Sequence, residues 1–362
     1  MRVFFSAGEA SGDAYAAALA PHFRQALPSA ELIGIGGSKS RAESIRQVVD
    51  SSHWGAMGVI QSLMKVPTVW LGLQKAKREL HSGPPGLLVP IDFGYFNVRL
   101  CRAAKAAGWK VLYFIPPGSW RRDKQGADLP SLTDEIVTPF PWSAELLNKA
   151  GGRAHFFGHP LAEMIGDLPE SSDRSGVAIL PGSRMHEIDE HLRVIAPVME
   201  GLDMPIRFGV AQTVTPSEME ASWKRFGGPP AEFTHDTHTI LKASRCGIVC
   251  SGTATLEAAL CGLPIITIYR GTKMMRFEYA LRKPKFFAIS LPNILLQKMV
   301  VPELIGEAVE PQAIDALLEN LMDDDEMRRT QLEAFEEIQK SLLGAQVFEK
   351  TAALAQKMMA EA

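Results

Sequence analysis

Short apolar runs alternate along the chain with longer stretches in which apolar residues recur at helical spacing. In the first half, six such runs predict buried strands: Val3–Ser6, Glu31–Gly36, Gly86–Ile91, Trp109–Ile115, Glu135–Thr138 and Ala154–Phe157. The stretch after the first run carries Tyr15, Leu19 and Phe23 on one face of a predicted helix. Strands that alternate with helices are typical of an α/β fold built on a parallel sheet.

The second half of the chain repeats the pattern of the first. A polar run, Asp167–Ser175, is followed by a predicted strand, Val177–Leu180, then by a Gly/Ser turn and a helix. A chain of 362 residues is longer than one core usually supports. We therefore predict two Rossmann-like, doubly wound domains that face a central cleft, residues 1–168 and 169–340. Residues 341–362 are predicted to form a C-terminal helix that packs back on the first domain.

The strongest local pattern lies in the second half. A predicted strand, Cys246–Cys250, leads through a turn of small polar residues into a helix that stops at Gly262. Small side chains let an anion approach the turn, and the helix N-terminus supplies free N–H groups and the positive end of a dipole. Glu257, about one turn into the helix, is placed to accept hydrogen bonds from ribose hydroxyls. The pattern predicts a nucleotide site, and an ordinary helix capped by Thr253 is the alternative.

A second candidate for phosphate binding follows the strand Val177–Leu180. Arg184 stands where a helix is predicted to begin, and a cation is unfavourable at a helix N-terminus. A guanidinium can bind two phosphate oxygens at once. We therefore favour a ligand role, in which Arg184 neutralises a departing diphosphate, over a solvated arginine.

Two features of the first half are candidates for substrate binding and catalysis. The turn Ala7–Asp13 can bind a phosphate or sugar through its N–H groups, although its spacing is not the G-x-G-x-x-G of dinucleotide sites. The alternative is a plain connection capped by Ser11. Asp92 ends the predicted strand Gly86–Ile91, at the sheet edge where ligands of parallel sheets bind. It is a candidate general base, or alternatively an N-cap for a helix that begins near Phe96.

The segment His53–Leu73 is strongly apolar and contains two tryptophans. Gln61, Lys65 and Pro67 interrupt it too often for it to span a bilayer. With the cations of Lys75–Arg78 beside it, the segment fits an anionic membrane interface or an acyl-chain pocket. Two core helices are the alternative, which composition alone favours.

Composition narrows the classes of protein and of partner. Apolar residues make up 46% of the chain and charged residues 22%, as in globular domains. The net charge of −3 gives no electrostatic reason to expect nucleic acid as a partner. No basic segment followed by an apolar run begins the sequence, so we expect no secretion signal. Four cysteines in apolar contexts without paired spacing predict reduced core residues of a cytosolic protein: Cys101, Cys246, Cys250 and Cys261.

Two patterns that suggest metal binding do not meet its requirements. His186 and His191 are five residues apart, whereas the H-E-x-x-H motif places its histidines four apart on one helix face. Asp323–Asp325 lies between two predicted helices, where acids favour a helix start. We therefore expect neither a metal nor a cofactor.

Eight short motifs occur in the same order as in a known family. They are Ser6–Asp13, Gly55–Gly58, Ile91–Asp92, Phe96–Asn97, Phe157–His159, Leu180–Arg184, Ser251–Glu257 and Ser290–Asn293. On these motifs the chain resembles the lipid A disaccharide synthase family over nearly its whole length. The resemblance implies a GT-B glycosyltransferase of lipid A biosynthesis. It implies an inverting reaction that joins UDP-2,3-diacylglucosamine to the 6-hydroxyl of 2,3-diacylglucosamine 1-phosphate.

With the resemblance, partners and residue roles can be assigned. The implied substrates are a UDP-linked acylated glucosamine donor and a lipid-phosphate acceptor. The resemblance also implies that this protein is cytoplasmic and binds peripherally to the inner face of the cytoplasmic membrane. The residues expected to bind UDP or its phosphates are Arg184, Ser251, Gly252, Thr253, Ala254, Glu257 and Asn293. Those expected on the acceptor side are Ser11, Gly12, Asp13 and Asn97.

One position departs from the family pattern. The family typically has an acid three residues after the position of Asp92, and this chain has Tyr95 there. Asp92 or Glu9 is therefore expected to act as the base, or the acceptor differs. The loop Pro116–Arg122 is also shorter than its counterpart in the family. The alternatives are a UDP-N-acetylglucosamine 2-epimerase-like enzyme and a UDP-sugar-binding protein without transfer activity.

Overall fold

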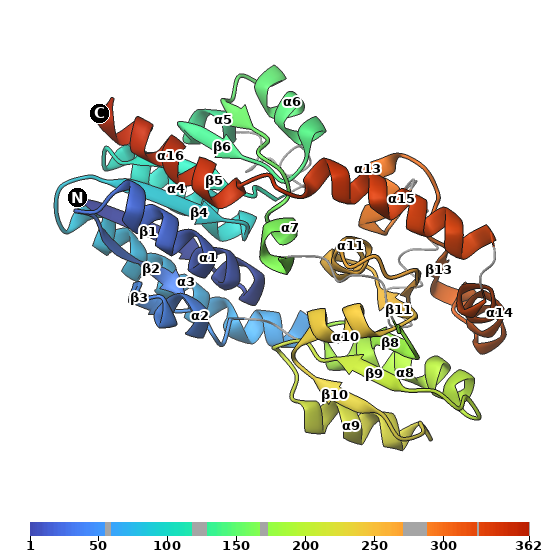
Figure 1. Cartoon of the computed structure of the whole chain (residues 1–362). Coiled ribbons are helices and arrows are strands. Elements are labelled where there is room, and N and C mark those ends of the chain that lie inside the picture. The colour runs from blue at the N-terminus through green and yellow to red at the C-terminus, as the bar shows by residue number, and fades with distance from the viewer. Residues whose placement is uncertain (55–58, 118–128, 167–172, 271–287, 324–325, 362) are drawn as a thin grey trace. The chain divides into compact units, whose positions relative to one another are not determined.

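The computed structural model describes the chain except for residues 55–58, 118–128, 167–172, 271–287, 324–325 and 362, and the side chains of residues 59–65. The described residues form two compact units (Figure 1). The first unit comprises Met1–Met164 and Gly344–Ala362, and the second comprises Ile165–Leu343. Several features predicted from the sequence lie wholly or partly outside the described residues: Gly55–Gly58, the apolar segment His53–Leu73, Pro116–Arg122, Asp167–Ser175 and Asp323–Asp325.

The first unit is built on a seven-stranded sheet in which each neighbouring pair of strands is parallel. In spatial order the strands are β3 (Arg46–Asp50), β2 (Glu31–Gly36), β1 (Arg2–Ala7), β4 (Leu87–Ile91), β5 (Lys110–Phe114), β6 (Glu135–Val137) and β7 (Ala154–His155). The chain order runs outwards in both directions from β1 and β4, which is the doubly wound arrangement predicted from the sequence. β4 is buried along its whole length and β1 along nearly all of it, because helices cover both faces of the sheet.

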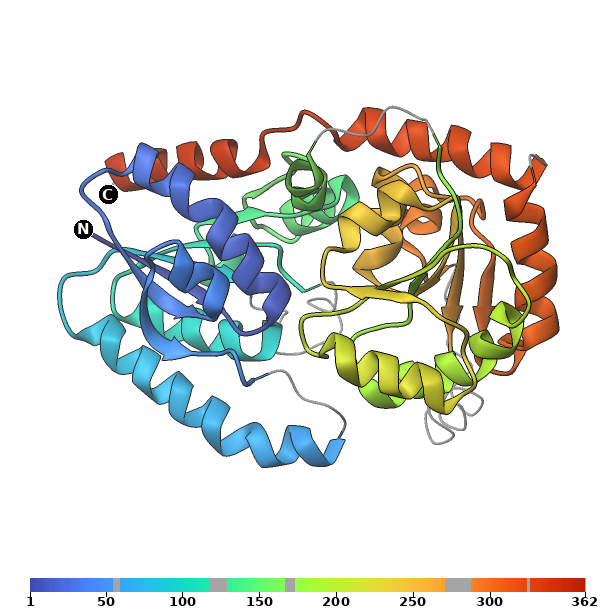
Figure 2. The same ribbon diagram turned by 60° about the horizontal axis from the view of Figure 1, so that its bottom comes forward.

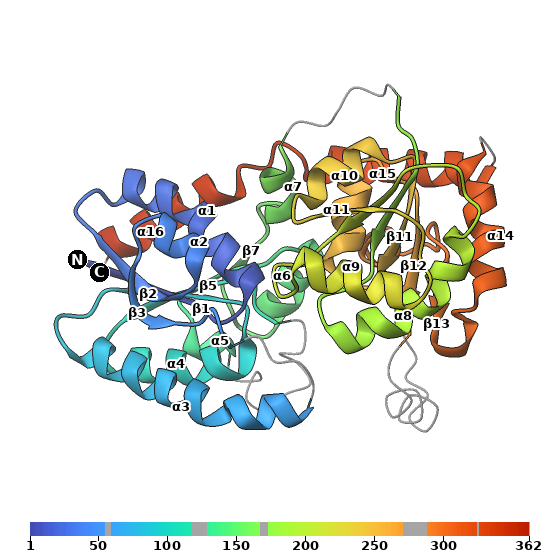
Figure 3. The same cartoon turned by 90° about the horizontal axis from the view of Figure 1, so that it is seen from below.

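The helices of the first unit lie on both faces of its sheet. They are α1 (Ala10–Ala26), α2 (Ser38–Ala42), α3 (Val59–His81), α4 (Gly94–Ala106), α5 (Leu129–Leu132), α6 (Pro141–Lys149), α7 (Pro160–Ile165) and α16 (Val347–Ala360). Figure 3 shows α1, α2 and α16 on one face, and α3 and α4 on the other. The C-terminal helix α16 runs beside α1 (Figure 2), where Gln356 Nε2 donates a hydrogen bond to the carbonyl of Ala26 at 2.8 Å.

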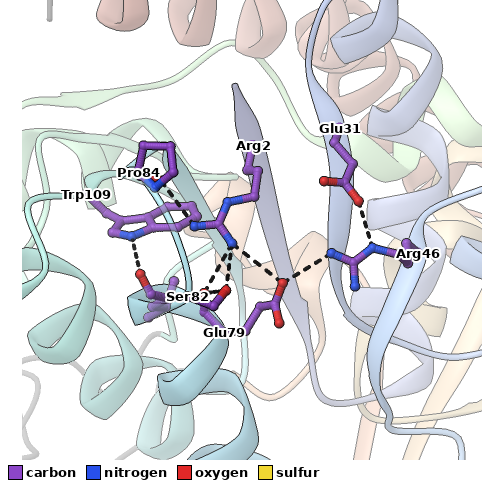
Figure 4. A network of polar contacts seen from close by, with 8 residues as sticks. Arg2, Glu31, Arg46, Glu79, Ser82, Pro84 and Trp109 are labelled. Carbon is purple, nitrogen blue, oxygen red and sulfur yellow. Dashed lines mark hydrogen bonds and ion pairs between the residues drawn. The ribbon is translucent and has the colours of Figure 1, made fainter.

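A polar network fastens the C-terminal end of α3 to the start of β1 (Figure 4). The guanidinium of Arg2 donates hydrogen bonds to the carbonyls of Glu79 and Pro84. It also donates to the hydroxyl of Ser82 and lies over the ring of Trp109, 5.1 Å from the ring centre. The indole N–H of Trp109 donates in turn to a backbone carbonyl of α3 at 2.9 Å. Ligands of parallel sheets bind at the opposite, carboxyl edge, so this network has a structural role.

The second unit contains a six-stranded sheet, again with parallel neighbours. In spatial order the strands are β10 (Glu232–Thr234), β9 (Ile206–Gly209), β8 (Val177–Leu180), β11 (Cys246–Cys250), β12 (Ile265–Tyr269) and β13 (Glu303–Ile305). Its helices are α8 (Met185–Met199), α9 (Pro216–Arg225), α10 (Thr237–Ala243), α11 (Thr253–Leu260), α13 (Leu291–Leu296), α14 (Pro311–Met322) and α15 (Glu326–Leu342), with a 3-10 turn at Gly306–Ala308. α8, α9 and α14 cover one face of the sheet, and α10, α11 and α15 cover the other (Figure 3).

The apolar segment of the first half forms one helix where the alternative prediction had two. α3 runs from Val59 to His81 and passes through Pro67, so the number of helices in that alternative is wrong. Its placement in the core is confirmed in part, because Leu73, Ala76 and Leu80 of α3 are buried in the core of the first unit. In the part of α3 whose side chains are described, Val66, Trp70 and Leu71 are each more than half exposed. Of the helices that the structure describes, none has both the length and the apolar character needed to cross a bilayer.

Candidate functional site

Both sheets reverse their chain order at the centre, between β1 and β4 and between β8 and β11. Ligands of open parallel sheets bind beside such reversal points, at the carboxyl ends of the strands. The helices that follow these four strands begin without a hydrogen bond from a side chain of their N-cap residue: Glu9, Phe93, Arg184 or Gly252. Thr215 caps α9 and Asp236 caps α10, whereas α2, α6, α13, α14 and α16 also begin without a side-chain cap. The four starts named above differ from these in their place beside the reversal points of the sheets. The first N–H groups of a helix have no partner within the helix, so uncapped starts leave donors for a ligand.

These helix starts decide three of the alternatives left open by the sequence. Ser11 lies inside α1, Asp92 precedes the N-cap of α4, and Thr253 is the first residue of α11. The predictions that these side chains serve as ordinary helix caps are therefore wrong. The turns that carry them need another explanation for their polar residues.

The turn between β11 and α11 leaves its backbone open. Among the described residues, no acceptor is found for the N–H groups of Gly252, Thr253 and Ala254. Gly252 has a φ of 139°, and apart from its two neighbours in the chain no described residue has an atom within 4 Å of the position that a Cβ would take. Any other residue would be strained there and would place a side chain in this open space. An anion can therefore approach the backbone donors at the positive end of α11.

The turn between β8 and α8 lies next to it, because β8 and β11 are neighbours in the sheet. The position of a Cβ on Gly182 would lie 3.5 Å from Cys250 Sγ, so the two turns pack closely. Arg184 has a half-exposed side chain, and its Nη1 donates to Oε1 of the buried Glu187 at 3.1 Å. This bond holds one end of the guanidinium and leaves the exposed part facing solvent, where it can bind phosphate oxygens.

His191 fastens this turn to the end of β12. Its ring is fully buried, Nδ1 donates to the carbonyl of Pro181 at 2.7 Å, and Nε2 accepts from the N–H of Arg270 at 2.8 Å. A carbonyl only accepts and a backbone N–H only donates, so these bonds define a neutral ring with its hydrogen on Nδ1. Burial lowers the pKa of His191 and so maintains this form. His191 is thus a support of the turn that carries Arg184.

Glu257 lies on α11 with a side chain that is 19% exposed. Nε2 of His238, in the first turn of α10, lies 3.4 Å from Glu257 Oε2. The histidine thus lies beside the carboxylate that was predicted to bind ribose. His238 was not predicted as a site residue, because neither β10 nor α10 was predicted from the sequence and no local motif marks the residue.

The side chain of Asn293 is not free to contact the nucleotide, as the resemblance implied it would be. Its side chain is fully buried, and Nδ2 donates to the carbonyl of Val301 and to Glu303 Oε1, each at 2.8 Å. Oδ1 accepts from the N–H groups of Val300 and Val301 at 2.8 and 2.9 Å. These bonds use all four hydrogen-bonding positions of the amide. Direct contact with a nucleotide would break them, so the structure indicates that Asn293 supports the surrounding backbone.

In the first unit, Asp92 and Phe93 follow β4 in a left-handed backbone conformation, with φ of 43° and 50°. Two successive non-glycine residues of this kind are strained and need support from their surroundings. The carbonyl of Asp92 accepts hydrogen bonds from the Tyr113 hydroxyl at 2.7 Å and from Asn97 Nδ2 at 2.8 Å. Burial raises the pKa of the Asp92 carboxyl, and the negative charge of Glu9 raises it further. A carboxyl with a raised pKa at a strand end suits a proton acceptor.

Two residues predicted on the acceptor side are buried and bonded within the first unit. Asn97 Nδ2 also donates to the carbonyls of Ser6 and Ile91, and its Oδ1 accepts from Ser6 Oγ at 2.6 Å, which joins β1 to β4. The carboxylate of Asp13 accepts from three N–H groups at the start of α2 at 2.6 to 3.2 Å. Asn97 therefore fixes the backbone at Asp92 and Asp13 fixes the start of α2, and the polar atoms of both side chains are already hydrogen-bonded within the unit.

The other positions near the predicted acceptor side differ in how far they are exposed to solvent. Ser11 is exposed, whereas Gly12 is buried and packs over Ala7. Tyr95 is 61% exposed, and the guanidinium of Arg99 lies 4.7 Å from the centre of its ring. The position at which the family carries an acid therefore presents a phenol to solvent.

Within the part of the chain that the structure describes, no group of three or more His, Cys, Asp or Glu side chains is placed to hold a metal. The four cysteines are free and buried, as predicted. Burial raises the pKa of Cys246, Cys250 and Cys261 to about 12, so these thiols are unreactive.

The fold defines the class of protein. It matches the calicheamicin glycosyltransferase CalG4 over 99% of this chain and 97% of that chain, with a TM-score of 0.61 and 15% identity. It matches UDP-GlcNAc 2-epimerase from Neisseria meningitidis, crystallised with UDP-GlcNAc, over 100% of this chain and 99% of that chain, with a TM-score of 0.59 and 11% identity. At such identities the likeness shows the fold alone, which is the GT-B fold with two parallel-sheet domains.

Sequence comparison narrows this class to one family. The profile of the lipid-A-disaccharide synthetase family matches residues 3–358. The lipid-A-disaccharide synthase of Neisseria gonorrhoeae is 33% identical over 340 residues, which cover 86% of this chain and 85% of that protein. The chain belongs to the lipid-A-disaccharide synthase family, and the resemblance stated from its motifs is confirmed.

Proposed function

We propose that this chain is the hexosyltransferase that joins UDP-2,3-diacylglucosamine to 2,3-diacylglucosamine 1-phosphate to form the lipid A disaccharide. Its membership of the family supports this reaction. The observation that carries the proposal is the open turn at Gly252, where the uncapped helix α11 begins. The reaction requires a site for a nucleotide diphosphate, and this turn offers backbone donors at a positive helix end.

The second unit provides the groups for the donor. The N–H groups of residues 252–254 bind the diphosphate, and Ser251 flanks them at the end of β11. Arg184 neutralises the charge that develops on UDP as its bond to the sugar breaks. Glu257, which lies beside His238, accepts hydrogen bonds from the ribose hydroxyls. Together these groups of the second unit bind UDP and stabilise it as the leaving group.

The first unit provides the base. Asp92 accepts the proton of the acceptor 6-hydroxyl while the oxygen forms a bond to the anomeric carbon of the donor. The bond from that carbon to the phosphate oxygen breaks on the opposite side, so the configuration inverts. The proton ends on the Asp92 carboxylate and the negative charge on UDP. A raised pKa favours such proton uptake, and Glu9 contributes to it.

One observation favours a second candidate, a UDP-sugar-binding protein without transfer activity. Tyr95 stands where the family carries an acid, and its side chain is exposed. A phenol does not replace a carboxylate as a proton acceptor at neutral pH. The two candidates therefore differ in whether Asp92 alone is a sufficient base. Membership of the family disfavours the epimerase-like alternative, whose fold is the same.

The test compares the wild type with Asp92→Asn and with Asp50→Asn, which changes an exposed acid of the same sheet. Transfer is measured with radiolabelled UDP-diacylglucosamine and acceptor in detergent micelles, and UDP binding is measured by calorimetry. We expect Asp92→Asn to lose transfer by about 100- to 10,000-fold with an unchanged Kd for UDP. Asp50→Asn should retain both. Unchanged turnover of Asp92→Asn removes Asp92 as the base, and a wild type that binds UDP without forming product supports the second candidate.

The chain is further proposed to act as a peripheral protein at the inner, cytoplasmic face of the cytoplasmic membrane, where diacylated substrates reside. Three exposed apolar side chains on α3 support this: Val66 is 57% exposed, Trp70 56% and Leu71 58%. Val66 and Trp70 are four residues apart and so share a face of the helix. Lys75 and Arg78 follow on the same helix. Exposed apolar side chains beside cations suit an anionic lipid surface.

A further inference from the structure

The segment Ile289–Leu291 is hydrogen-bonded to residues at both ends of the turn that begins α11. Ser251 Oγ donates to the carbonyl of Ile289 at 2.9 Å. The N–H of Leu291 donates to Thr255 Oγ1 at 3.0 Å, and the same hydroxyl donates to the carbonyl of Gly252 at 2.8 Å. The segment therefore contacts the residues that flank the open N–H groups of the turn.

On its other side, the segment is held by one carboxylate on the edge strand β13. Glu303 Oε2 accepts from the N–H of Ile289 at 2.9 Å. Glu303 Oε1 accepts from the N–H of Ser290 at 2.9 Å, from its hydroxyl at 2.8 Å, and from Asn293 Nδ2 at 2.8 Å. Ser290 and Asn293 are fully buried, so these donors have no access to solvent water.

Removal of the carboxylate would leave buried donors without an acceptor. A buried donor without an acceptor is unfavourable, so the segment would shift to find other partners. Because Ile289 bonds to Glu303 through its N–H and to Ser251 through its carbonyl, a shift of this peptide would move the turn. The amide of Asn293 couples the same carboxylate to the backbone at Val300 and Val301.

We propose that Glu303 is a positioning residue for the nucleotide diphosphate. It holds Ile289–Leu291 against Ser251 and Thr255 and thereby keeps the N–H groups of the α11 turn aligned for the phosphates. The inference rests on the proposed role of this turn as the UDP site. It assigns Glu303 to donor binding, with no part in acceptor binding or proton transfer.

The test begins with Glu303→Gln. Its amide oxygen can replace Oε1, but its NH₂ group then faces the N–H of Ile289, and two donors oppose each other. We expect the Kd for UDP and the KM for the donor to rise about three- to tenfold. The KM for the acceptor and kcat at saturating donor should remain near the wild-type values. Glu310→Gln is the matched control, because Glu310 is exposed and its side chain does not cap α14.

A second pair of variants tests the other side of the segment. Thr255→Val has a similar shape but cannot accept from the N–H of Leu291, whereas Thr255→Ser keeps the hydroxyl. The valine variant should weaken UDP binding in the same way, and the serine variant should restore it. If Glu303→Gln lowers the Tm while the Kd for UDP and the donor KM stay at wild-type values, Glu303 is only structural. The inference then fails, while the proposed donor site is unaffected. If the wild type itself does not bind UDP, the proposed donor site fails and the inference with it.

Discussion

At the scale of single residues, the carboxyl group of Asp92 determines how transfer should depend on pH. Burial, and then the charge of Glu9, raises the pKa of Asp92 above its usual 3.8. The base must be ionised to accept a proton, so kcat/KM should fall as the pH drops through this raised pKa. Glu9→Gln removes a negative charge, which lowers the pKa of Asp92 and should move the acidic limb of the profile to lower pH. The measurement is kcat/KM against pH for both proteins.

The matched control for this prediction is Glu145→Gln, which removes an exposed carboxylate from α6. Its profile should coincide with that of the wild type. An acidic limb that stays in place in Glu9→Gln would show that the charge of Glu9 does not act on the base. An acidic limb that persists in Asp92→Asn with residual activity would assign the base to another group.

The position of a candidate site could be predicted from the sequence where one local pattern marks it. The turn at Ser251–Glu257 follows a single apolar strand and opens a single helix, so spacing alone located it. The bonding of Asp13 and Asn97 could not be predicted, because a carboxylate or amide near a strand end suits a ligand and a backbone N–H equally well. Glu303 was missed because its partners in the segment 289–293 lie 10 to 14 residues away.

At the scale of elements, the position of α3 depends on the half-buried Arg2. This guanidinium bonds to three acceptors around the end of α3 and lies over Trp109 (Figure 4). Arg2→Gln removes most of these contacts and should lower the free energy of unfolding by about 1–3 kcal/mol. The measurement is urea unfolding followed by fluorescence.

The control for Arg2 lies in the same network. Arg46 bonds to Glu31 and Glu79, but its side chain is 52% exposed. Exposed ion pairs contribute little, so Arg46→Gln should cost less than about 1 kcal/mol. Equal losses from the two variants would mean that the contacts of Arg2 add nothing beyond a surface ion pair.

Three of the strands that were not predicted from the sequence are edge strands, and the fourth is the short inner strand β9. β3, β10 and β13 lie at the edges of the two sheets, and most of their residues are partly or fully exposed. An edge strand needs no continuous apolar run, so the pattern that marked the central strands is absent there. The same exposure explains why β13, which carries Glu303, could not be predicted.

At the scale of the whole molecule, the proposed donor groups belong to the second unit and the proposed base to the first. Changes at Glu303 should therefore act on donor binding, changes at Arg184 on donor binding and on the departure of UDP, and changes at Asp92 on proton transfer. The surface proposed to meet the membrane, on α3, also belongs to the first unit. Its contribution can be separated from catalysis, because Trp70 and Leu71 are exposed and are not among the residues assigned to binding or proton transfer.

The double variant Trp70→Ser/Leu71→Ser should lose membrane binding and keep its catalytic groups. Burial of these two side chains in lipid contributes on the order of several kcal/mol, so binding should fall by about tenfold or more. The measurement is co-sedimentation with vesicles that contain phosphatidylglycerol. Added salt should also weaken wild-type binding, since it screens Lys75 and Arg78.

The control is Met299→Ser, which changes a side chain 51% exposed in the second unit and should bind vesicles as the wild type does. Transfer between micelle-dispersed substrates should be the same in all three proteins, because the groups at Asp92 and Arg184 are intact. A double variant that still sediments with vesicles would show that α3 is not the surface that binds lipid. Loss of micellar transfer together with vesicle binding would instead point to damage to the first unit, because α3 also packs on α4 within its core.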